Sequence, residues 1–144
     1  MVQPFERGTF WRCALRCLTA CLVLAASPWI AFGQDSAQIT GIWRGNSVCT
    51  VDNSPCHNEA NVYRFSEVPG KSNRFSCTAS KIVDGKEIVM GSGEWTYDPS
   101  RHLLQTVTSS PTIRLTLDHD ILDGALIFSN STMYRRIHLK KSQD

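Results

Sequence analysis

The sequence predicts an all-β protein, an antiparallel up-and-down barrel of eight to nine strands with no significant helix after an export signal. Two observations favour this fold. From residue 39 onward, polar and apolar side chains alternate with a period of two, and turn residues interrupt the alternation about every 8–12 residues. The connections are short, and none offers the dozen or so residues that a parallel crossover requires. A sheet of this many strands removes its exposed edges by closing into a barrel.

The first 33 residues have the composition of a secretion signal. An apolar run, C-L-T-A-C-L-V-L-A-A, follows a basic segment and precedes the small residues of a cleavage site at Ala31-Phe32-Gly33. The run is shorter than the ~20 residues that a spanning helix needs. We therefore expect a cleaved signal peptide (residues 1–33) and a secreted or periplasmic location, with an uncleaved anchor as the alternative. Lipidation of Cys21 is not favoured, because the apolar run continues beyond it.

Residues 34–144, interpreted as a single domain, carry no formal net charge. The leader holds three of the 15 basic residues and one of the 13 acidic residues, which leaves 12 of each. Nucleic acids and anionic membranes are bound by clustered Lys and Arg on basic domains. We therefore expect no nucleic-acid partner and no embedding in a membrane, and we expect a monomer.

Five strands are expected in the first half of this domain, at residues 39–49, 61–66, 74–83, 86–91 and 94–97. Tyr63 and Phe65 share one face of the second strand. Asp84-Gly85 predicts a two-residue hairpin turn, because both central positions of that turn favour positive φ. The Gly91-Ser92-Gly93 break predicts a bulge or a bend between the last two strands.

Four more strands are expected in the second half, at residues 102–108, 112–118, 121–128 and 132–140. Residues 112–118 alternate without a fault, with Ile113, Leu115 and Leu117 on the inner face. Asp123-Gly124, inside the next strand, is an alternative turn. Each remaining segment between two expected strands is rich in turn-forming residues.

Three cysteines lie beyond the leader. Cys49 and Cys56 flank a turn sequence, Asp52-Asn53-Ser54-Pro55, and export permits disulfides. A bridge between them would stabilise the fold by about 2–3 kcal/mol in the chain-entropy model. Cys77 is then unpaired, and its same-face neighbours are apolar, so we expect a buried and inert thiol. Exchange into the disulfide, a bridge between two chains and a nucleophilic role are the alternatives.

The final strand presents an arginine on its apolar face. Arg135 alternates in phase with Met133, Ile137 and Leu139, so its guanidinium should point inward or toward a barrel mouth. A buried cation without a partner is costly. Stacking on an indole face offsets part of that cost, and Trp43 is the expected partner.

Gly41-Ile42-Trp43 in the first strand, together with Arg135 in the last, resembles the lipocalin/calycin superfamily. In that superfamily the tryptophan packs at the closed end of the barrel under a late-strand arginine. The stretch from Ile39 to Trp43 also resembles the opening of the avidin branch. The resemblance implies that Gly41, Trp43 and Arg135 form a structural plug at one end of the barrel and leave the other end open.

The chain departs from typical lipocalins. It is shorter, and it lacks an evident C-terminal helix and the T-D-Y motif of the middle loops, so the resemblance implies the barrel more than classical ligand transport. Ser54-Pro55-Cys56-His57-x-Glu59 and Tyr134-Arg135-Arg136 are similar to stretches of short exported bacterial proteins. That second likeness brings no activity with it.

Catalytic and metal motifs are scarce. Asp118-His119-Asp120 has ligand-type residues, but its turn composition explains it fully, and nothing in the sequence brings Glu59 and Glu94 together. Asn130-Ser131-Thr132 matches the glycosylation pattern and is interpreted as a turn. We expect a protein that is not an enzyme and that uses neither a cofactor nor a metal.

The barrel interior is the expected functional site. Eight strands enclose a space that side chains fill or that holds one small ligand. We expect a small apolar or aromatic ligand in the open mouth, with walls formed by Tyr63, Phe65, Trp95 and Tyr97. The alternative is a filled barrel that serves as a protein-interaction or protease-inhibitor-type module. A cavity of a few hundred Å³ favours the first function, whereas a filled interior with an exposed apolar rim favours the second.

Overall fold

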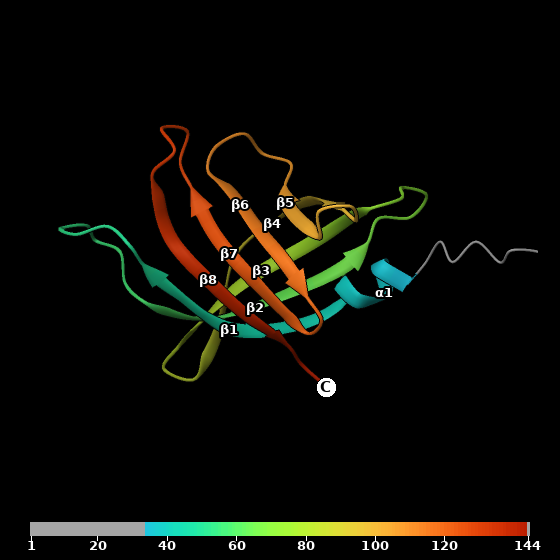
Figure 1. The fold of residues 1–144 in the computed structure, drawn as a ribbon. Helices are drawn as coiled ribbons and strands as arrows, with labels where there is room; N and C mark the ends of the chain where they lie inside the picture. Colours follow the sequence, from blue (N-terminus) through green and yellow to red (C-terminus); the bar gives the residue numbers. More distant parts are fainter. Residues whose placement is uncertain (1–33, 144) are drawn as a thin grey trace, which may run out of the picture. The chain divides into compact units, whose positions relative to one another are not determined.

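The computed structural model describes residues 34–143, with side chains from residue 37 onward. The predicted signal peptide, its cleavage point and Cys21 lie outside these residues. The described chain forms a closed antiparallel barrel in which each strand pairs with the next and β1 also pairs with β8 (Figure 1). The eight strands are β1 (Gly41–Cys49), β2 (Glu59–Glu67), β3 (Arg74–Val83), β4 (Lys86–Asp98), β5 (Leu103–Thr106), β6 (Thr112–Asp118), β7 (Ile121–Ile127) and β8 (Met133–Lys141). The predicted up-and-down barrel is confirmed.

Two predicted strands form one continuous strand. Residues 86–91 and 94–97 both belong to β4, because Gly91, Ser92 and Gly93 keep their pairing with β3 instead of ending it. The register shifts by one residue next to them, where Met90 is the extra residue opposite the step from Ala79 to Ser80. A bulge of this kind bends a strand and leaves its pairing intact. The described residues therefore form eight strands.

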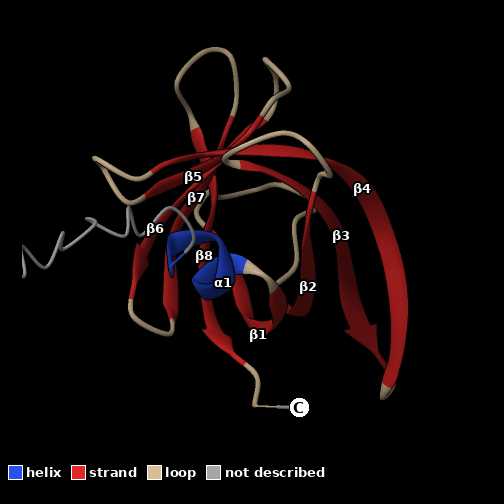
Figure 2. Ribbon diagram, turned by 90° about the vertical axis from the view of Figure 1, so that its right-hand side faces the viewer, coloured by secondary structure: helices blue, strands red, loops and turns tan. Residues whose placement is uncertain are grey.

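A short helix, α1 (Gln34–Ile39), precedes the barrel. The last residue of α1 is Ile39, which the sequence pattern assigns to the first strand. The chain then changes direction at Gly41, whose φ of 125° is accessible to glycine and strained for other residues. Viewed as in Figure 2, α1 lies at one end of the barrel, close to β1. We call this the closed end.

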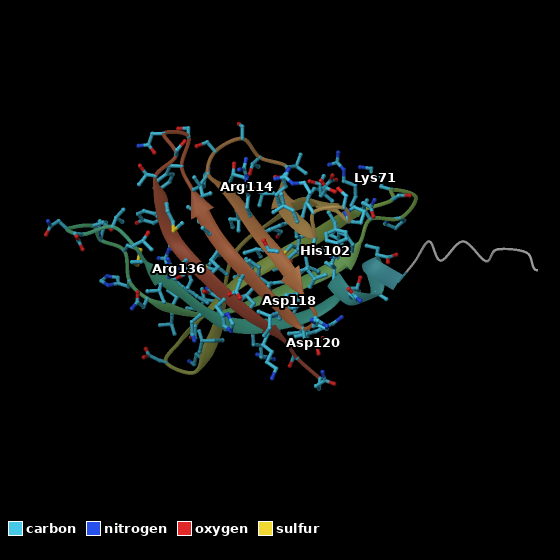
Figure 3. All side chains as sticks on the ribbon, in the orientation of Figure 1. Lys71, His102, Arg114, Asp118, Asp120 and Arg136 are labelled. Carbon is cyan, nitrogen blue, oxygen red and sulfur yellow. A yellow bond between two sulfur atoms is a disulfide. The ribbon has the colours of Figure 1, made fainter. Side chains whose placement is uncertain are left out.

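Large inward side chains fill the closed end. They include Trp43, Phe75, Leu104, Leu115, Leu122 and Leu139, all of which are almost fully buried. The labelled charged residues in Figure 3, among them Arg114, Asp118 and Arg136, are exposed on the outside of the barrel. The inward positions at the opposite end, which we call the open end, carry smaller residues, and this difference in size positions the candidate site.

Candidate functional site

A cavity of about 360 Å³ occupies the open end of the barrel. All eight strands contribute to its lining, and its apolar floor includes Ala79, Ile113, Leu126 and Ile137. The volume falls within the range of small-molecule sites, about 300–1,000 Å³. The interior is thus filled at one end and hollow at the other.

Two glycines on β4 leave part of this space. A Cβ atom built at Gly91 or Gly93 meets no atom within 4 Å, and both residues line the cavity. Gly45 and Gly124 differ, because a Cβ at either position would collide with a backbone carbonyl of a neighbouring strand. Gly45 and Gly124 permit neighbouring strands to approach closely, whereas Gly91 and Gly93 leave part of the cavity unfilled.

Three aromatic rings form a cluster between the two ends. The ring centroid of Trp95 lies 6.3 Å from that of Tyr63 and 5.3 Å from that of Phe65, both in edge-to-face arrangements. Such pairs stabilise each other beyond their simple burial. All four predicted wall residues belong to the buried core; Tyr63 and Trp95 also line the cavity, whereas Phe65 and Tyr97 do not.

Two ionisable groups in the cavity wall are held in their neutral forms. Burial is the main cause that raises the pKa of the Tyr63 phenol well above its ordinary value. Burial also raises the pKa of the Cys77 thiol to about 12. Cys77 is buried and unpaired, as predicted, and a protonated thiol is a poor nucleophile. At these two positions the wall therefore presents a hydroxyl and a thiol instead of anions.

Arg135 lies at the mouth of this cavity. Its guanidinium is 3.2 Å from the Glu59 carboxylate, donates to the His57 carbonyl at 3.0 Å, and donates to the Ser47 hydroxyl at 3.3 Å. Lys81 lies 3.9 Å from the same carboxylate. The inward arginine predicted from the alternation is present, and an ion pair compensates its charge.

The predicted stack of Arg135 on Trp43 is wrong. In the β1–β8 pairing, Arg135 is opposite Cys49, whereas Trp43 is opposite Lys141. Six residues along β1 separate the two positions, which corresponds to about 20 Å at the rise of a strand. Alternation identified the correct face of β8, but it carries no information about position along the barrel axis. Arg135 therefore does not belong to the plug.

Lys141 occupies the position predicted for the arginine. Its ammonium lies 5.7 Å from the centroid of the Trp43 ring and donates to the Ala37 and Gln38 carbonyls at 2.9 and 2.6 Å. These are carbonyls of the last turn of α1, where a cation is favourable. The Trp43 indole N–H donates to the Ile39 carbonyl at 2.8 Å. A lysine, an indole and a helix end together close the barrel.

The predicted disulfide is present. Cys49 and Cys56 are bonded, with their Cα atoms 6.0 Å apart. The Asn58 side chain accepts a hydrogen bond from the Cys49 backbone N–H at 2.9 Å. This bridge fixes the loop between β1 and β2, which carries His57, next to the cavity mouth.

The first half of β4 is an open sheet edge, which the sequence analysis missed. Residues 86–93 pair with β3, but within the described chain β5 pairs with β4 only from Trp95 to Asp98. Ile88, Val89 and Met90 on this edge are 46%, 62% and 46% exposed. Met90 also lines the cavity. No local pattern in the sequence reveals this edge, because the edge depends on how short β5 is, and packing decides that length.

Among residues 34–143, no group of three or more metal-ligand side chains is placed to hold an ion. His119 bonds to Asp118 at 2.7 Å on a fully exposed turn. None of the described helices has the length and apolar character needed to cross a membrane.

The fold and cavity define the class of protein: a small eight-stranded antiparallel barrel, filled at one end and hollow at the other. The sequence matches no protein-family model, and comparison with curated proteins gives no match. The structure supports the coarser expectation of a small closed antiparallel barrel with a buried first-strand tryptophan, and these two comparisons do not support the lipocalin family specifically.

Proposed function

We propose that this protein is an exported, non-enzymatic β-barrel that binds a small apolar or aromatic molecule in the cavity at its open end. The cavity carries the proposal, because a barrel whose role was only structural would gain stability by filling about 360 Å³ of interior space. The apolar floor and the Tyr63–Trp95 wall suit a flat hydrophobic molecule. The leader pattern and the Cys49–Cys56 bridge support export.

The absence of catalysis is part of the proposal. The cavity wall contains one thiol, that of Cys77, and burial keeps it protonated at neutral pH. The Glu59 carboxylate is engaged by Arg135 at 3.2 Å and by Lys81 at 3.9 Å. These contacts favour binding over chemistry.

The test uses two variants that gain the same side chain. Gly93→Leu projects a leucine into the cavity from a position where nothing lies within 4 Å of the added Cβ. Ser76→Leu adds a leucine to the outer, exposed face of the neighbouring strand. Binding of a set of small aromatic and aliphatic fragments is measured by saturation-transfer NMR. Wild type and Ser76→Leu should bind several fragments, and Gly93→Leu should bind none. Equal binding by all three chains, or no binding to wild type, would refute the proposal.

The open edge of β4 favours a second function, recognition of a partner protein that adds an extended strand. Residues 86–90, which precede the glycines of the cavity wall, offer an unpaired backbone edge, and Ile88, Val89 and Met90 are exposed along it. Exposed apolar edges of this kind are templates for strand addition. Binding of such a partner should be lost in the Val89→Lys variant and retained in the Gly93→Leu variant. The reverse result would assign the partner to the cavity instead.

A further inference from the structure

We propose that the molecule bound in the cavity carries a carbonyl-type oxygen, which accepts hydrogen bonds from the Tyr63 hydroxyl and the Trp95 indole N–H. This inference rests on the proposed function and specifies the chemistry of its ligand. The oxygen belongs to a ketone, an amide or a carboxylate attached to a flat apolar body.

Two polar groups in the aromatic wall have no partner. Tyr63 and Trp95 are only 4% and 3% exposed, yet within residues 34–143 neither the phenol O–H nor the indole N–H makes a hydrogen bond. Buried tyrosines and tryptophans usually find such partners. Both residues line the cavity, so their unmet groups belong to the site.

Two buried aromatic residues that do not line the cavity show the contrast. Trp43 donates its indole N–H to the Ile39 carbonyl at 2.8 Å. The Tyr97 hydroxyl lies 3.4 Å from Nδ1 of His102. The same residue types are therefore paired away from the cavity and unpaired at its wall. A ligand that supplies the missing acceptor accounts for this difference.

Both donor atoms also have accessible surface. The described side-chain atoms that are sealed off and lack a partner are Oδ1 of Asn61 and Oγ of Ser80. The Tyr63 oxygen and the Trp95 nitrogen are not among them, so each borders open space. The cavity is the open space that these two side chains line.

The chemistry of the two groups selects an acceptor. An indole N–H is a donor and never an acceptor. The raised pKa of Tyr63 keeps its phenol protonated across the neutral range, so it also donates. A pure hydrocarbon would displace water from both donors and leave them unsatisfied, which costs affinity. A ligand oxygen avoids that loss, while the body of the ligand packs against Ile113, Leu126 and Ile137.

The test compares three probes that share a naphthalene body by calorimetric titration of the full chain. Naphthalene has no acceptor, 2-acetylnaphthalene has a neutral carbonyl, and 2-naphthoate has a carboxylate. We expect the two oxygen-bearing probes to bind at least about tenfold more tightly than naphthalene. A higher affinity for the ketone than for the carboxylate would assign the acceptor to a neutral ligand, and the reverse would assign it to an anion.

Variants that remove the donor and keep an aromatic ring at the position connect this preference to the two residues. Tyr63→Phe and Trp95→Phe should each weaken binding of 2-acetylnaphthalene by about three- to tenfold, with little change for naphthalene. Tyr97→Phe is the matched control, because it removes a phenol hydroxyl that the structure places in the core and pairs with His102. It should change neither affinity.

Two different failures are distinguishable. If all three probes bind wild type equally, or if the Tyr63→Phe and Trp95→Phe variants keep the preference for oxygen, the acceptor inference is wrong and the cavity remains a binding site. If no probe binds wild type and fragment binding also fails, the proposed function is wrong, and this inference falls with it.

Discussion

The closed and open ends of this barrel have the same alternation of inward and outward residues, but the closed end is filled and the open end is hollow. At the closed end, Trp43 and its neighbours are large, and the Trp43 indole N–H is paired. At the open end the inward positions include Gly91 and Gly93, and within the described residues the polar atoms of Tyr63 and Trp95 have no hydrogen-bond partner. The comparison shows that a period-two pattern specifies which face of a strand is buried, whereas the size of the inward residues specifies where the interior stays hollow.

The largest expected effect is at the closed end. Trp43→Ala should lower the free energy of unfolding by about 3–5 kcal/mol, because it empties a fully buried aromatic site and removes the ring beneath Lys141. Urea unfolding followed by circular dichroism measures the change. A loss below about 1 kcal/mol would mean that the closed end is not the stabilising half of the barrel.

The Cys49–Cys56 disulfide should also stabilise the fold, at the open end of the barrel. Replacing Cys49 and Cys56 with serine should lower the free energy of unfolding by about 2–3 kcal/mol, since the loop between β1 and β2 regains freedom in the unfolded chain. The same urea experiment measures this loss. Adding a reducing agent to wild type should reproduce the loss and should leave the double serine variant unchanged. No difference between the two chains would show that the loop is fixed without the bridge.

Substitution of single glycines tests most directly whether the closed end is filled and the open end is hollow. Gly45→Ala should destabilise the barrel by about 1–3 kcal/mol, because its Cβ would collide with the backbone carbonyl of His138. Gly93→Ala should stay within about 0.5 kcal/mol of wild type, because its Cβ enters open space. Thermal unfolding of both variants measures the pair. Equal losses at the two positions would argue against a hollow open end.

The smallest expected effect is on the outer surface. Glu87 forms an ion pair with Arg64, and that contact lowers the pKa of the Glu87 carboxyl from 4.5 to about 2. A lowered pKa in the folded state means that the contact stabilises the fold above pH 4.5 and that this contribution is lost as the pH falls toward 2. Glu87→Gln should therefore flatten the dependence of stability on pH in that window. An unchanged profile would show that the exposed pair contributes nothing measurable.

Much of the fold was predictable from local patterns. The bounds of β3 and β6 match the expected strands, and the Asp84-Gly85 turn and the Cys49–Cys56 bridge are where the sequence placed them. Each of these features depends on residues that are near one another in the chain. Turn chemistry and alternation act over that range.

The errors concern relationships between distant segments. Alternation placed Arg135 on the inner face of β8 correctly, but the register between β1 and β8 decides that Lys141, not Arg135, reaches Trp43. The glycines of β4 suggested an interruption, yet pairing with β3 holds them in a single strand. The open edge of β4 depends on where β5 ends. Registers and strand neighbours are properties of the closed sheet, so a local pattern does not contain them.

The central claim is that the open end holds a small molecule. A native mass spectrum of the protein purified from its own host tests this claim most directly, with Gly93→Leu prepared in parallel. The account predicts a retained small-molecule mass on wild type that is absent from Gly93→Leu. Wild type that shows the mass of the polypeptide alone, or a retained mass that survives in Gly93→Leu, would contradict it.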